Sequence, residues 1–544
     1  SGEPGVKSEC LPFTQVPHTT DLFRDFLYSY EKVQRFYPRS PYFQQWAKDV
    51  AANLRYDSAR RERVAGVLQR QNQSWGASAE TLANVSRLRQ GASAVVTGQQ
   101  VGLFGGPAFA IYKALTAVKL ARVATEAGVE CVPVFWLATE DHDLDEVKHI
   151  SIPGPDASLE KLVTPVTSKP DAPVGTIAFG PEIQQVVDEA ARRLGDTEAV
   201  QLLRETYKPA QTFGSAFARL FANLFAEWGV VLLDASDPEL HQIAAPIYAS
   251  AVECAAEINE LLLERGKELE AANYHQQVKV TPSSTLLFML KDGARVPISR
   301  DLRDGENRGF LAENQKFQQS ELLEQIHSQP QDFSPNVLLR PVVQDYLLPT
   351  LAYTGGSAEV AYFAQAAVVY ERLLERTTPI VPRFSATLLE PKLQTLLDRY
   401  RLTISQIFDG PESVREQLAS QALSKELQSA FDNAETSIKN SVSAIRTALE
   451  YLDKTLVDAA ENAGSKIQYQ LESLRSKAAR AELRQTEVVA RKAQLLSNAL
   501  YPNKTLQERG VAWIYFLSRY GRDFLQNIYD CIHSDCLDHQ VISL

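Results

Sequence analysis

A glycine-rich segment near residue 100 is the strongest chemical signal in this chain. Apolar residues (94–96) precede it, and a helical apolar pattern that includes Ile111, Leu115 and Val118 follows it. Glycine lets backbone N–H groups approach a ligand closely, and the N-terminus of the next helix adds partial positive charge. The segment therefore predicts an anion or nucleotide site, although a plain tight turn would look similar and the spacing matches neither common phosphate-loop motif. The predicted substrate contacts are Thr97, Gly98, Gln99, Gln100, Gly102 and Gly106.

An acidic segment with one histidine follows the next apolar run (132–137). Residues 140–146 read Glu-Asp-His-Asp-Leu-Asp-Glu. Open parallel sheets bind ligands at the carboxyl ends of their strands, so this segment and the glycine-rich segment are expected to face one crevice. We assign catalytic roles to Asp141, His142 and Asp143, with His142 as general acid or base and an aspartate that could hold Mg²⁺. A solvated acidic loop is the alternative interpretation.

A polar helix face and a second glycine turn add further candidates. Asn336, Arg340 and Gln344 are spaced four apart, which predicts a shared helix face. Arg340 can bind a carboxylate or phosphate through two parallel hydrogen bonds, whereas a solvent-exposed polar face is the alternative. The predicted substrate contacts in this region are Asn336, Arg340, Gln344, Asp345, Gly355, Gly356, Glu359 and Tyr362.

Residues 413–500 carry a heptad repeat. Apolar residues recur every seven positions from Phe431 to Ala459 and from Ile467 to Leu495, which predicts a coiled coil. Gly464 lies near the middle and is expected to mark the reversal of an antiparallel hairpin. A hairpin brings its two ends together, which predicts a second pocket at its base that binds a nucleotide; hinge capping and salt bridges are the alternative. The residues expected there are Arg383, Ser385, Glu390, Tyr501, Asn503, Gln507 and Arg509.

These patterns predict an α/β protein with a Rossmann-like parallel-sheet core and an α-helical, antiparallel coiled-coil arm. Two segments rich in loops or short strands interrupt the core pattern. The expected parts are N-terminal helices at 1–90, the core at 91–385 with inserted segments at about 151–210 and 273–335, the arm at 386–500 and a return to the core at 501–544.

Composition narrows the class of partner. The chain has 544 residues and a net charge of −11, which disfavours a nucleic-acid surface. It has no apolar run long enough for a membrane span and no signal peptide, so we expect a cytoplasmic protein without a membrane partner. Its five cysteines are scattered, as in a reducing compartment. The C-terminal Cys531, His533, Cys536 and His539 lack a standard zinc-finger spacing, so no metal site is expected there.

Taken together, the motifs resemble one family, the BshC cysteine ligases of bacillithiol biosynthesis. The resemblance extends over about residues 13–530. It implies a Rossmann core with inserted connecting segments, a coiled-coil arm that mediates homodimerisation, and a nucleotide pocket apart from the main cleft. The matching segments, in order along the chain, are 97–107, 135–143, 334–345, 355–359 and 506–509.

The resemblance also implies a reaction, in which the carboxyl group of cysteine is joined to the amine of glucosaminyl-malate. Amide formation needs an activated carboxyl group, so we expect ATP or ADP as the nucleotide, with Mg²⁺ as a candidate companion. Small-molecule substrates are thus the expected partners: cysteine, glucosaminyl-malate and the nucleotide. Two other hypotheses stay open, namely a nucleotide-binding coiled-coil interaction protein without catalysis and a nucleotidyltransferase with another acceptor.

Overall fold

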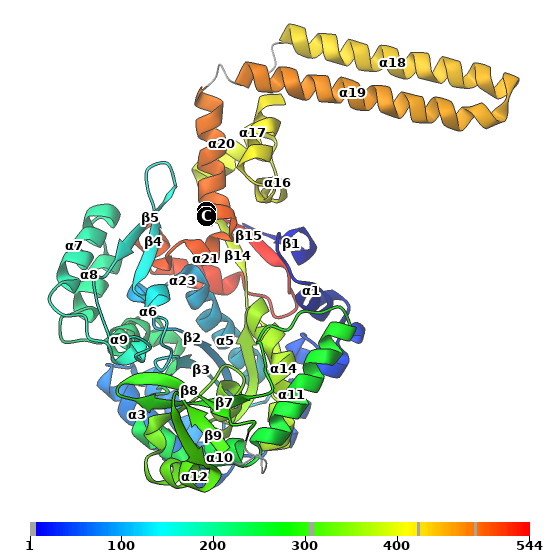
Figure 1. The fold of residues 1–544 in the computed structure, drawn as a ribbon. Coiled ribbons are helices and arrows are strands. Elements are labelled where there is room, and N and C mark those ends of the chain that lie inside the picture. The colour runs from blue at the N-terminus through cyan, green and yellow to red at the C-terminus, as the bar shows by residue number, and fades with distance from the viewer. Residues whose placement is uncertain (1–6, 304–308, 421–424, 484–486) are drawn as a thin grey trace. The chain divides into compact units, whose positions relative to one another are not determined.

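Five strands with mostly apolar side chains form a parallel sheet at the centre of the α/β region (Figure 1). The computed structural model describes residues 7–303, 309–420, 425–483 and 487–544. Strands buried on both faces are predominantly apolar, which is why the sequence lacks an alternating pattern here. The strands are β2 (Ser93–Gln99), β3 (Cys131–Leu137), β6 (Val231–Asp234), β12 (Thr350–Gly355) and β13 (Ile380–Pro382).

The order of these strands is β13-β12-β2-β3-β6, and every neighbouring pair is parallel. Numbered along the chain and read from the β6 edge, this is the order 3-2-1-4-5 of a Rossmann sheet. The order reverses between β2 and β12, and ligands bind at the carboxyl ends of strands at such a point. The structure thus confirms the predicted fold class and directs attention to the turns that follow β2 and β12.

Helices cover this sheet. The helix α5 (Ala108–Glu126) packs on β2 and β3, α3 (Ser58–Ser74) packs on β6, and α14 (Ser357–Leu374) packs on β13. Side-chain caps fix several helix starts, as where Asp57 accepts from the Arg60 N–H at the start of α3. The other helices around the sheet are α1 (Asp21–Tyr28), α2 (Ala47–Asn53), α4 (Ala79–Gln90), α9 (Phe213–Leu224), α10 (Pro238–Glu253), α11 (Ala255–Ala271) and α13 (Arg340–Leu347).

Two insertions interrupt the sheet. The first, between β3 and β6, contains α6 (Leu144–Val147), β4 (His149–Pro153), β5 (Leu159–Val163), α7 (Ile183–Leu194) and α8 (Glu198–Thr206). The second, between β6 and β12, forms an antiparallel sheet of order β10-β9-β8-β7-β11 with α12 (Gln319–Ser328). Its strands are β7 (Ser284–Lys291), β8 (Ala294–Arg300), β9 (Gly309–Ala312), β10 (Gln315–Gln318) and β11 (Phe333–Pro335).

The chain divides into two compact units. The first consists of Ser1–Ile152, Glu160–Thr387 and Glu508–Ile542, and the second of Pro153–Leu159, Leu388–Gln507 and Ser543–Leu544. The first unit includes the C-terminal helices α22 (Trp513–Tyr520) and α23 (Asp523–Asp530), and α21 (Gln507–Gly510) lies at the boundary. A small sheet of order β1-β15-β14 pairs the first described strand with the last, and its strands are β1 (Lys7–Leu11), β14 (Ala386–Leu389) and β15 (His539–Ser543).

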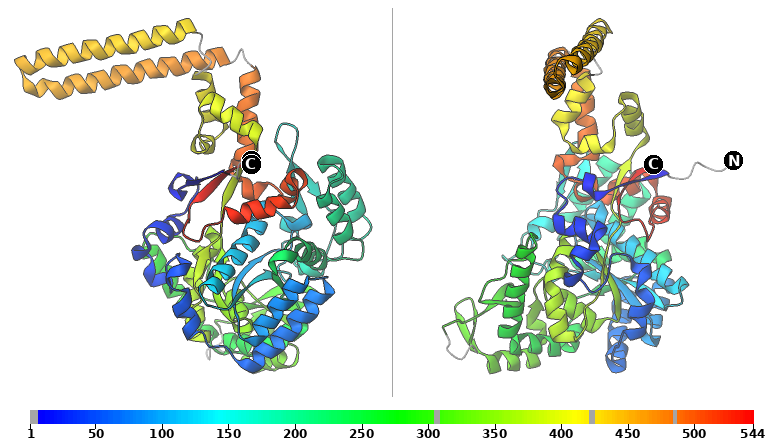
Figure 2. Two further views of the ribbon diagram at one scale, coloured as in Figure 1. Left: turned by 180° about the vertical axis from the view of Figure 1, so that it is seen from behind. Right: turned by 90° about the vertical axis from the view of Figure 1, so that its right-hand side faces the viewer.

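The second unit contains the predicted helical hairpin. Its long helices α18 (Lys425–Leu452) and α19 (Val457–Leu483) run side by side in opposite directions (Figure 2). Arg446 of α18 pairs with Glu461 of α19 at 3.2 Å. The remaining helices of this unit are α15 (Pro391–Tyr400), α16 (Ile404–Phe408), α17 (Pro411–Ser420) and α20 (Glu487–Leu500).

The prediction that the hairpin reverses at Gly464 is wrong. The chain reverses at 453–456, where Asp453 leaves the helix and its carboxylate accepts from the Thr455 N–H. Gly464 lies inside α19, where a Cβ would come within 2.8 Å of Val442 Cγ1 on α18. This glycine therefore permits close helix packing, and a small polar cap makes the turn.

Among the described residues, no helix is both long and apolar enough to cross a membrane.

Gly175 of the first insertion lies directly against Thr139 in the loop after β3, and only a glycine leaves room for this contact. The Gly175 N–H donates to the Thr139 carbonyl at 2.8 Å, and a Cβ on Gly175 would lie 2.7 Å from the Thr139 Cα. We expect Gly175→Ala to lower the free energy of unfolding by about 1–3 kcal/mol, since the backbone must shift to make room.

The matched control is Gly66→Ala in α3, where a Cβ meets nothing within 4 Å. That change should stabilise the helix slightly. Chemical denaturation of both variants tests this expectation, and equal stability of the two would contradict it.

Candidate active site

The largest cavity described in the first unit opens where the sheet order reverses. It has a volume of about 790 Å³ and lies at the carboxyl ends of β2, β3 and β12. A neighbouring cavity of about 260 Å³ shares five lining residues with it: Gln99, Gln100, Phe109, Glu146 and Arg509. Of the residues predicted from sequence, the larger cavity is lined by Gly98, Gln99, Gln100, Asp141, His142, Asn336, Arg340, Gly356, Glu359, Tyr362, Arg383 and Arg509.

The glycines of the turn after β2 mainly allow its backbone conformation. Gly105 and Gly106 have φ values of +87° and +74°, a region that glycine adopts without strain. The N–H groups of Gly102, Gly105 and Gly106 donate to carbonyls within the turn, so they are not free for a ligand. Gly102 and Gly106 line the smaller cavity. Gly98 faces the larger cavity, and a Cβ there would lie 3.1 Å from the Trp136 carbonyl oxygen.

A buried ion pair joins the two glycine turns. Lys113 of α5 donates from Nζ to the Gly98 carbonyl at 2.8 Å, to Gln99 Oε1 at 3.0 Å and to Glu359 Oε1 at 2.8 Å. Glu359 in the first turn of α14 also accepts from the Gly356 N–H and from the Tyr353 hydroxyl, both at 2.6 Å. The pair therefore fixes the floor of the cavity where β2 and β12 end.

The electrostatics of this pair follow from its burial. Burial lowers the pKa of Lys113 to about 8, although the neighbouring Glu359 carboxylate opposes this effect. Burial acts to raise the pKa of Glu359, but Lys113 and the hydrogen bonds from Tyr353 and Gly356 outweigh it, so this pKa lies below its ordinary value. Both groups are thus charged at neutral pH, and each depends on the other.

Arginines make one side of the cavity cationic. Arg383 is neutralised, since it pairs with the buried Glu508 at 2.7 Å. Arg340 instead donates to Gln344 Oε1 at 3.0 Å and to the Tyr362 hydroxyl at 3.3 Å. In the part of the chain that the structure describes, neither Arg340 nor Arg509 makes an ion pair with a carboxylate. These two guanidinium groups are therefore available for an anionic ligand.

The loop after β3 forms an acidic side. Glu140 Oε1 lies 2.8 Å from His241 Nε2, and His241 Nδ1 lies 3.0 Å from the Tyr248 hydroxyl. Burial acts to lower the pKa of His241, but the Glu140 carboxylate raises it, and the net pKa lies above 6.5. Glu140 faces the cavity while His241 and Tyr248 lie behind it in α10. Glu140 is therefore a carboxylate at the cavity wall that a buried histidine orients from behind.

His142 faces the cavity in a defined tautomer. Arg295 of β8 donates to His142 Nδ1 at 3.2 Å, and it also donates to Ser334 Oγ and the Pro335 carbonyl. Because arginine only donates, Nδ1 must accept, which leaves Nε2 to carry the proton. His142 can therefore donate a hydrogen bond to a ligand from Nε2. The neighbouring Asp141 accepts from Gln100 Nε2 at 2.7 Å.

Several predicted site residues either do not line the larger cavity or do so in a different arrangement from the predicted one. Asp143 caps α6, where its carboxylate accepts from the Glu146 N–H. Asn336 faces the cavity but precedes α13, so it does not share a helix face with Arg340 and Gln344; its side chain accepts from the Leu338 and Leu339 N–H groups instead. The buried residues behind the wall are Thr97, Gln344, Asp345 and Gly355.

The structure describes every residue that was predicted for a second pocket. In the first unit, Arg383 and Arg509 line the main cavity, and Ser385 donates to Glu508. In the second unit, Gln507 bonds the backbone of Leu388, and Tyr501 packs on Phe408. Glu390 precedes α15 as its N-cap residue, and the exposed Asn503 has a φ of +51°. The second nucleotide pocket itself stays a prediction.

Sequence reasoning missed several residues that line the cavity or contact those that do, among them Lys113, Trp136, His241 and Arg295. Lys113 had a signal, since it is the one charged residue in the first half (108–118) of the helix after a glycine turn. Trp136, His241 and Arg295 had none, because they reach the site from an apolar strand, a distant helix and an insertion strand.

The Lys113–Glu359 pair gives a stability prediction. We expect Lys113→Met to lower the free energy of unfolding by about 3–5 kcal/mol, because it leaves Glu359 buried without its cation. The double variant Lys113→Met/Glu359→Gln removes both charges and should recover most of the loss. Chemical denaturation measures both, and a double variant no more stable than the single one would argue against the pair.

The Glu140–His241 pair gives a pH prediction. The pKa of His241 is raised in the folded state, so the pair's stabilisation is fully present below pH 6.5 and is lost as the pH rises through the folded pKa. The difference in stability between wild type and His241→Gln should thus shrink between pH 6 and pH 8.5. Thermal unfolding at the two pH values measures it; a difference that is constant with pH would show that His241 does not titrate in this window.

Comparisons with known proteins agree with this architecture. Residues 6–384 match the family model "Bacillithiol biosynthesis BshC, N-terminal Rossmann-like domain", and residues 386–544 match "Bacillithiol biosynthesis BshC, C-terminal coiled-coil domain". A relative from Koribacter versatilis is 50% identical over 534 residues, which cover 98% of this chain and 99% of the relative. Relatives from Solibacter usitatus and Salinibacter ruber are 36% and 33% identical, and they cover 98% and 96% of this chain and 99% and 96% of their own lengths. All three carry the name "Putative cysteine ligase BshC". The chain therefore belongs to the BshC family of bacillithiol biosynthesis.

Proposed function

We propose that this chain is a ligase that joins the carboxyl group of cysteine to the amine of glucosaminyl-malate, with activation of the carboxyl group by a nucleotide. Its family membership and the names of its relatives support the ligase assignment. The observation that carries the proposal is the two-sided cavity at the point where the sheet order reverses. One side offers Arg340 and Arg509, and the other offers Glu140 and His142.

This arrangement suits a condensation between an acid and an amine. A carboxylate oxygen of cysteine attacks a phosphorus atom of ATP, which forms a mixed anhydride and releases either pyrophosphate or ADP. The amine of the acceptor then attacks the activated carbonyl carbon, loses a proton and expels the phosphoryl-bearing group. In this scheme Arg340 and Arg509 bind anionic groups of the substrates, and Glu140, supported by His241, accepts the amine proton.

The acidic loop is suited to a metal ion that arrives with the nucleotide. Asp141 and Glu146 both accept from Gln100 Nε2, at 2.7 and 3.0 Å. Among the described residues, this loop does not bring three ligand atoms within 4.8 Å of one another. Mg²⁺ commonly uses one or two carboxylates together with phosphates and water. Asp141 and Glu146 are therefore the residues that would hold Mg²⁺ beside a bound nucleotide.

The direct test is a reaction with ATP, cysteine and glucosaminyl-malate. The proposal expects an amide product whose formation consumes ATP and requires both other substrates, and the appearance of AMP or ADP identifies the activation step. Nucleotide binding without consumption would favour the non-catalytic interaction protein. Transfer of a nucleotidyl group to another acceptor would favour the nucleotidyltransferase.

Arg340 is expected to bind a carboxylate of the malate group. Arg340→Lys keeps the charge but loses the planar pair of donors, so the KM for the acceptor should rise about tenfold while kcat changes little. Steady-state kinetics with a malate-bearing acceptor measure this effect. Arg372→Lys, on the exposed side of α14, is the control and should behave as wild type. Unchanged kinetics in Arg340→Lys would remove this residue from acceptor binding.

A second nucleotide site at the base of the arm is a separate proposal that the family resemblance supports. Calorimetric titration of ADP distinguishes the two locations, with Gly102→Val altering the smaller cavity beside the main one and Asn503→Ala altering the arm base. Loss of ADP binding in Asn503→Ala alone supports a second site. Loss in Gly102→Val alone would place the nucleotide at these two neighbouring cavities.

We also propose that the arm makes the protein a homodimer. Heptad residues that a coiled coil would bury stay exposed on the hairpin, with exposed fractions of 55% for Ile445, 46% for Ile467 and 56% for Leu474. A second copy of the hairpin would cover this apolar surface. Sedimentation should show a dimer for wild type and a monomer for Ile445→Glu/Leu474→Glu. A dimer that persists in this variant would place the interface elsewhere.

A further inference from the structure

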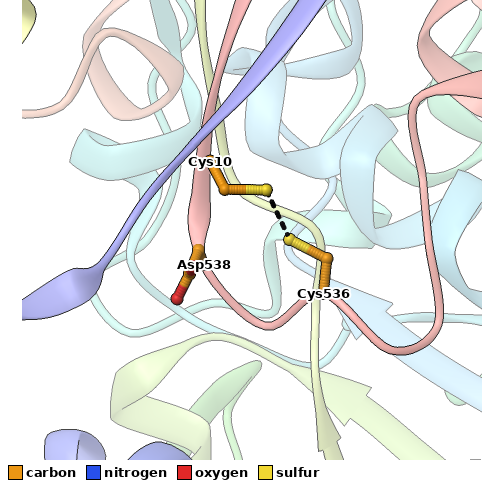
Figure 3. Close-up of side chains that lie close together, drawn as sticks. All are labelled: Cys10, Cys536 and Asp538. Atoms are coloured by element: carbon orange, nitrogen blue, oxygen red, sulfur yellow. Dashed lines mark hydrogen bonds between the residues drawn. The ribbon is translucent and has the colours of Figure 1, made fainter.

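Two cysteines from opposite ends of the chain meet beside the small sheet β1-β15-β14 (Figure 3). Cys10 lies in β1, and Cys536 lies three residues before β15. Their Sγ atoms are 3.0 Å apart although 526 positions separate them in sequence. Cys10 is exposed and Cys536 is partly exposed, so solution reagents can reach this pair.

Neighbouring hydrogen bonds hold the two segments in place. The Tyr28 hydroxyl donates to Asp538 Oδ1 at 2.6 Å and accepts from the Phe13 N–H at 2.8 Å. Ser8 of β1 also donates to Gln540 of β15. The sulfur atoms are therefore brought together by folded structure on both sides and not by a chance contact of loose ends.

Asp538 makes a metal site the competing interpretation. One ligand atom from each of Cys10, Cys536 and Asp538 lies within 4.8 Å of the others. Two thiolates on one tetrahedral zinc ion, with Zn–S bonds of about 2.3 Å, would lie about 3.8 Å apart. The observed 3.0 Å is shorter, and one oxygen of Asp538 already accepts from Tyr28. A disulfide joins its sulfurs at about 2.05 Å, so its formation requires a movement of only about 1 Å.

We propose that Cys10 and Cys536 form a reversible disulfide that ties the N-terminal strand to the C-terminal segment, with a low-molecular-weight disulfide as the oxidant. The sulfur of Cys10 attacks this disulfide and displaces one thiol, which gives a mixed disulfide. The sulfur of Cys536 then attacks Cys10, loses its proton to water and displaces the second thiol. Two protein thiols are thereby oxidised, and one small disulfide is reduced to two thiols.

The two cysteines have different roles in this exchange reaction. Burial raises the pKa of Cys536 to about 12, so its thiol stays protonated at neutral pH. Cys10 is the exposed sulfur, and it is the one that meets the incoming reagent. Exchange requires a thiolate, so oxidation should become faster as the pH rises.

The disulfide would also affect the wall of the cavity, because β15 connects the two. His539 follows Asp538 directly and lies 2.7 Å from Ser385 Oγ and 2.8 Å from Thr387 Oγ1. Ser385 bonds Glu508, which is the partner of Arg383. A covalent link at Cys536 therefore restrains the strand that supports this buried cluster. This inference does not depend on the proposed ligase reaction.

Thiol counting on the full chain tests the proposal. The reduced protein, equilibrated with graded ratios of oxidised to reduced glutathione, is denatured and alkylated, and the labels are counted by mass. The chain has five cysteines, so wild type should fall from five labels to three, and a peptide map should link Cys10 to Cys536. Cys10→Ser and Cys536→Ser should form no internal disulfide. The control Cys531→Ser, which replaces a buried cysteine near this pair in sequence, should fall from four labels to two.

Hydrogen exchange adds a structural readout, since amides of β1 and β15 should exchange more slowly in the oxidised protein. Three results would overturn the proposal: five labels at every ratio, a glutathione adduct on Cys10 without an internal bond, or a different cysteine pairing. Stoichiometric zinc in the purified protein that is lost in Cys10→Ser would assign the three residues to a metal site instead.

Discussion

The buried contact between Lys113 and Glu359 is the constraint on which the cavity depends. One residue belongs to the helix after β2 and the other to the helix after β12, so the pair spans the point where the sheet order reverses. The two strands are neighbours in the sheet, and the ion pair links the helices that follow them. The ammonium group binds the Gly98 carbonyl and Gln99, while the carboxylate binds Gly356 and Tyr353. One ion pair therefore positions four groups of the cavity floor.

This constraint also determines which charges remain for a ligand. Lys113 and Arg383 satisfy buried carboxylates of the protein itself, so their charges are already neutralised. Arg340 and Arg509 have no such partner among the described residues, and the Tyr362 hydroxyl and Gln344 hold Arg340 in place. A preorganised cation needs little rearrangement to bind an anion, so the proposed substrate-binding roles fall to Arg340 and Arg509 and not to Lys113 or Arg383.

The sequence predicted the fold better than the site. Apolar runs, glycine turns and heptads identified the parallel sheet and the helical hairpin, because these features depend on local patterns. The heptad pattern could not place the hairpin turn, since a glycine that permits close packing looks like a glycine that permits a turn. Gly464 and Asp453 are thus distinguishable only once the packing of α18 on α19 is known.

Site residues next to a recognisable turn, such as Gln99, Glu359 and His142, were predictable because the turn directs them to the carboxyl edge of the sheet. The partners that set their chemistry were not. His241 reaches Glu140 from α10, and Arg295 reaches His142 from β8. No sequence spacing relates residues that are joined only by tertiary packing.

The insertions explain how an open Rossmann crevice becomes a bounded cavity. The sheet turns supply the floor and the cationic side, whereas Phe288, Arg295 and Pro335 from the second insertion supply part of the opposite wall. Arg295 joins this wall to the acidic loop by fixing the tautomer of His142, and the N–H of Val174 from the first insertion donates to the Asp141 carbonyl from another side. The acidic loop is therefore held between two insertions, so the orientation of its donors depends on segments outside the sheet. Substrate selection is expected to lie in these segments, because they can change without altering the ion pair that holds the floor.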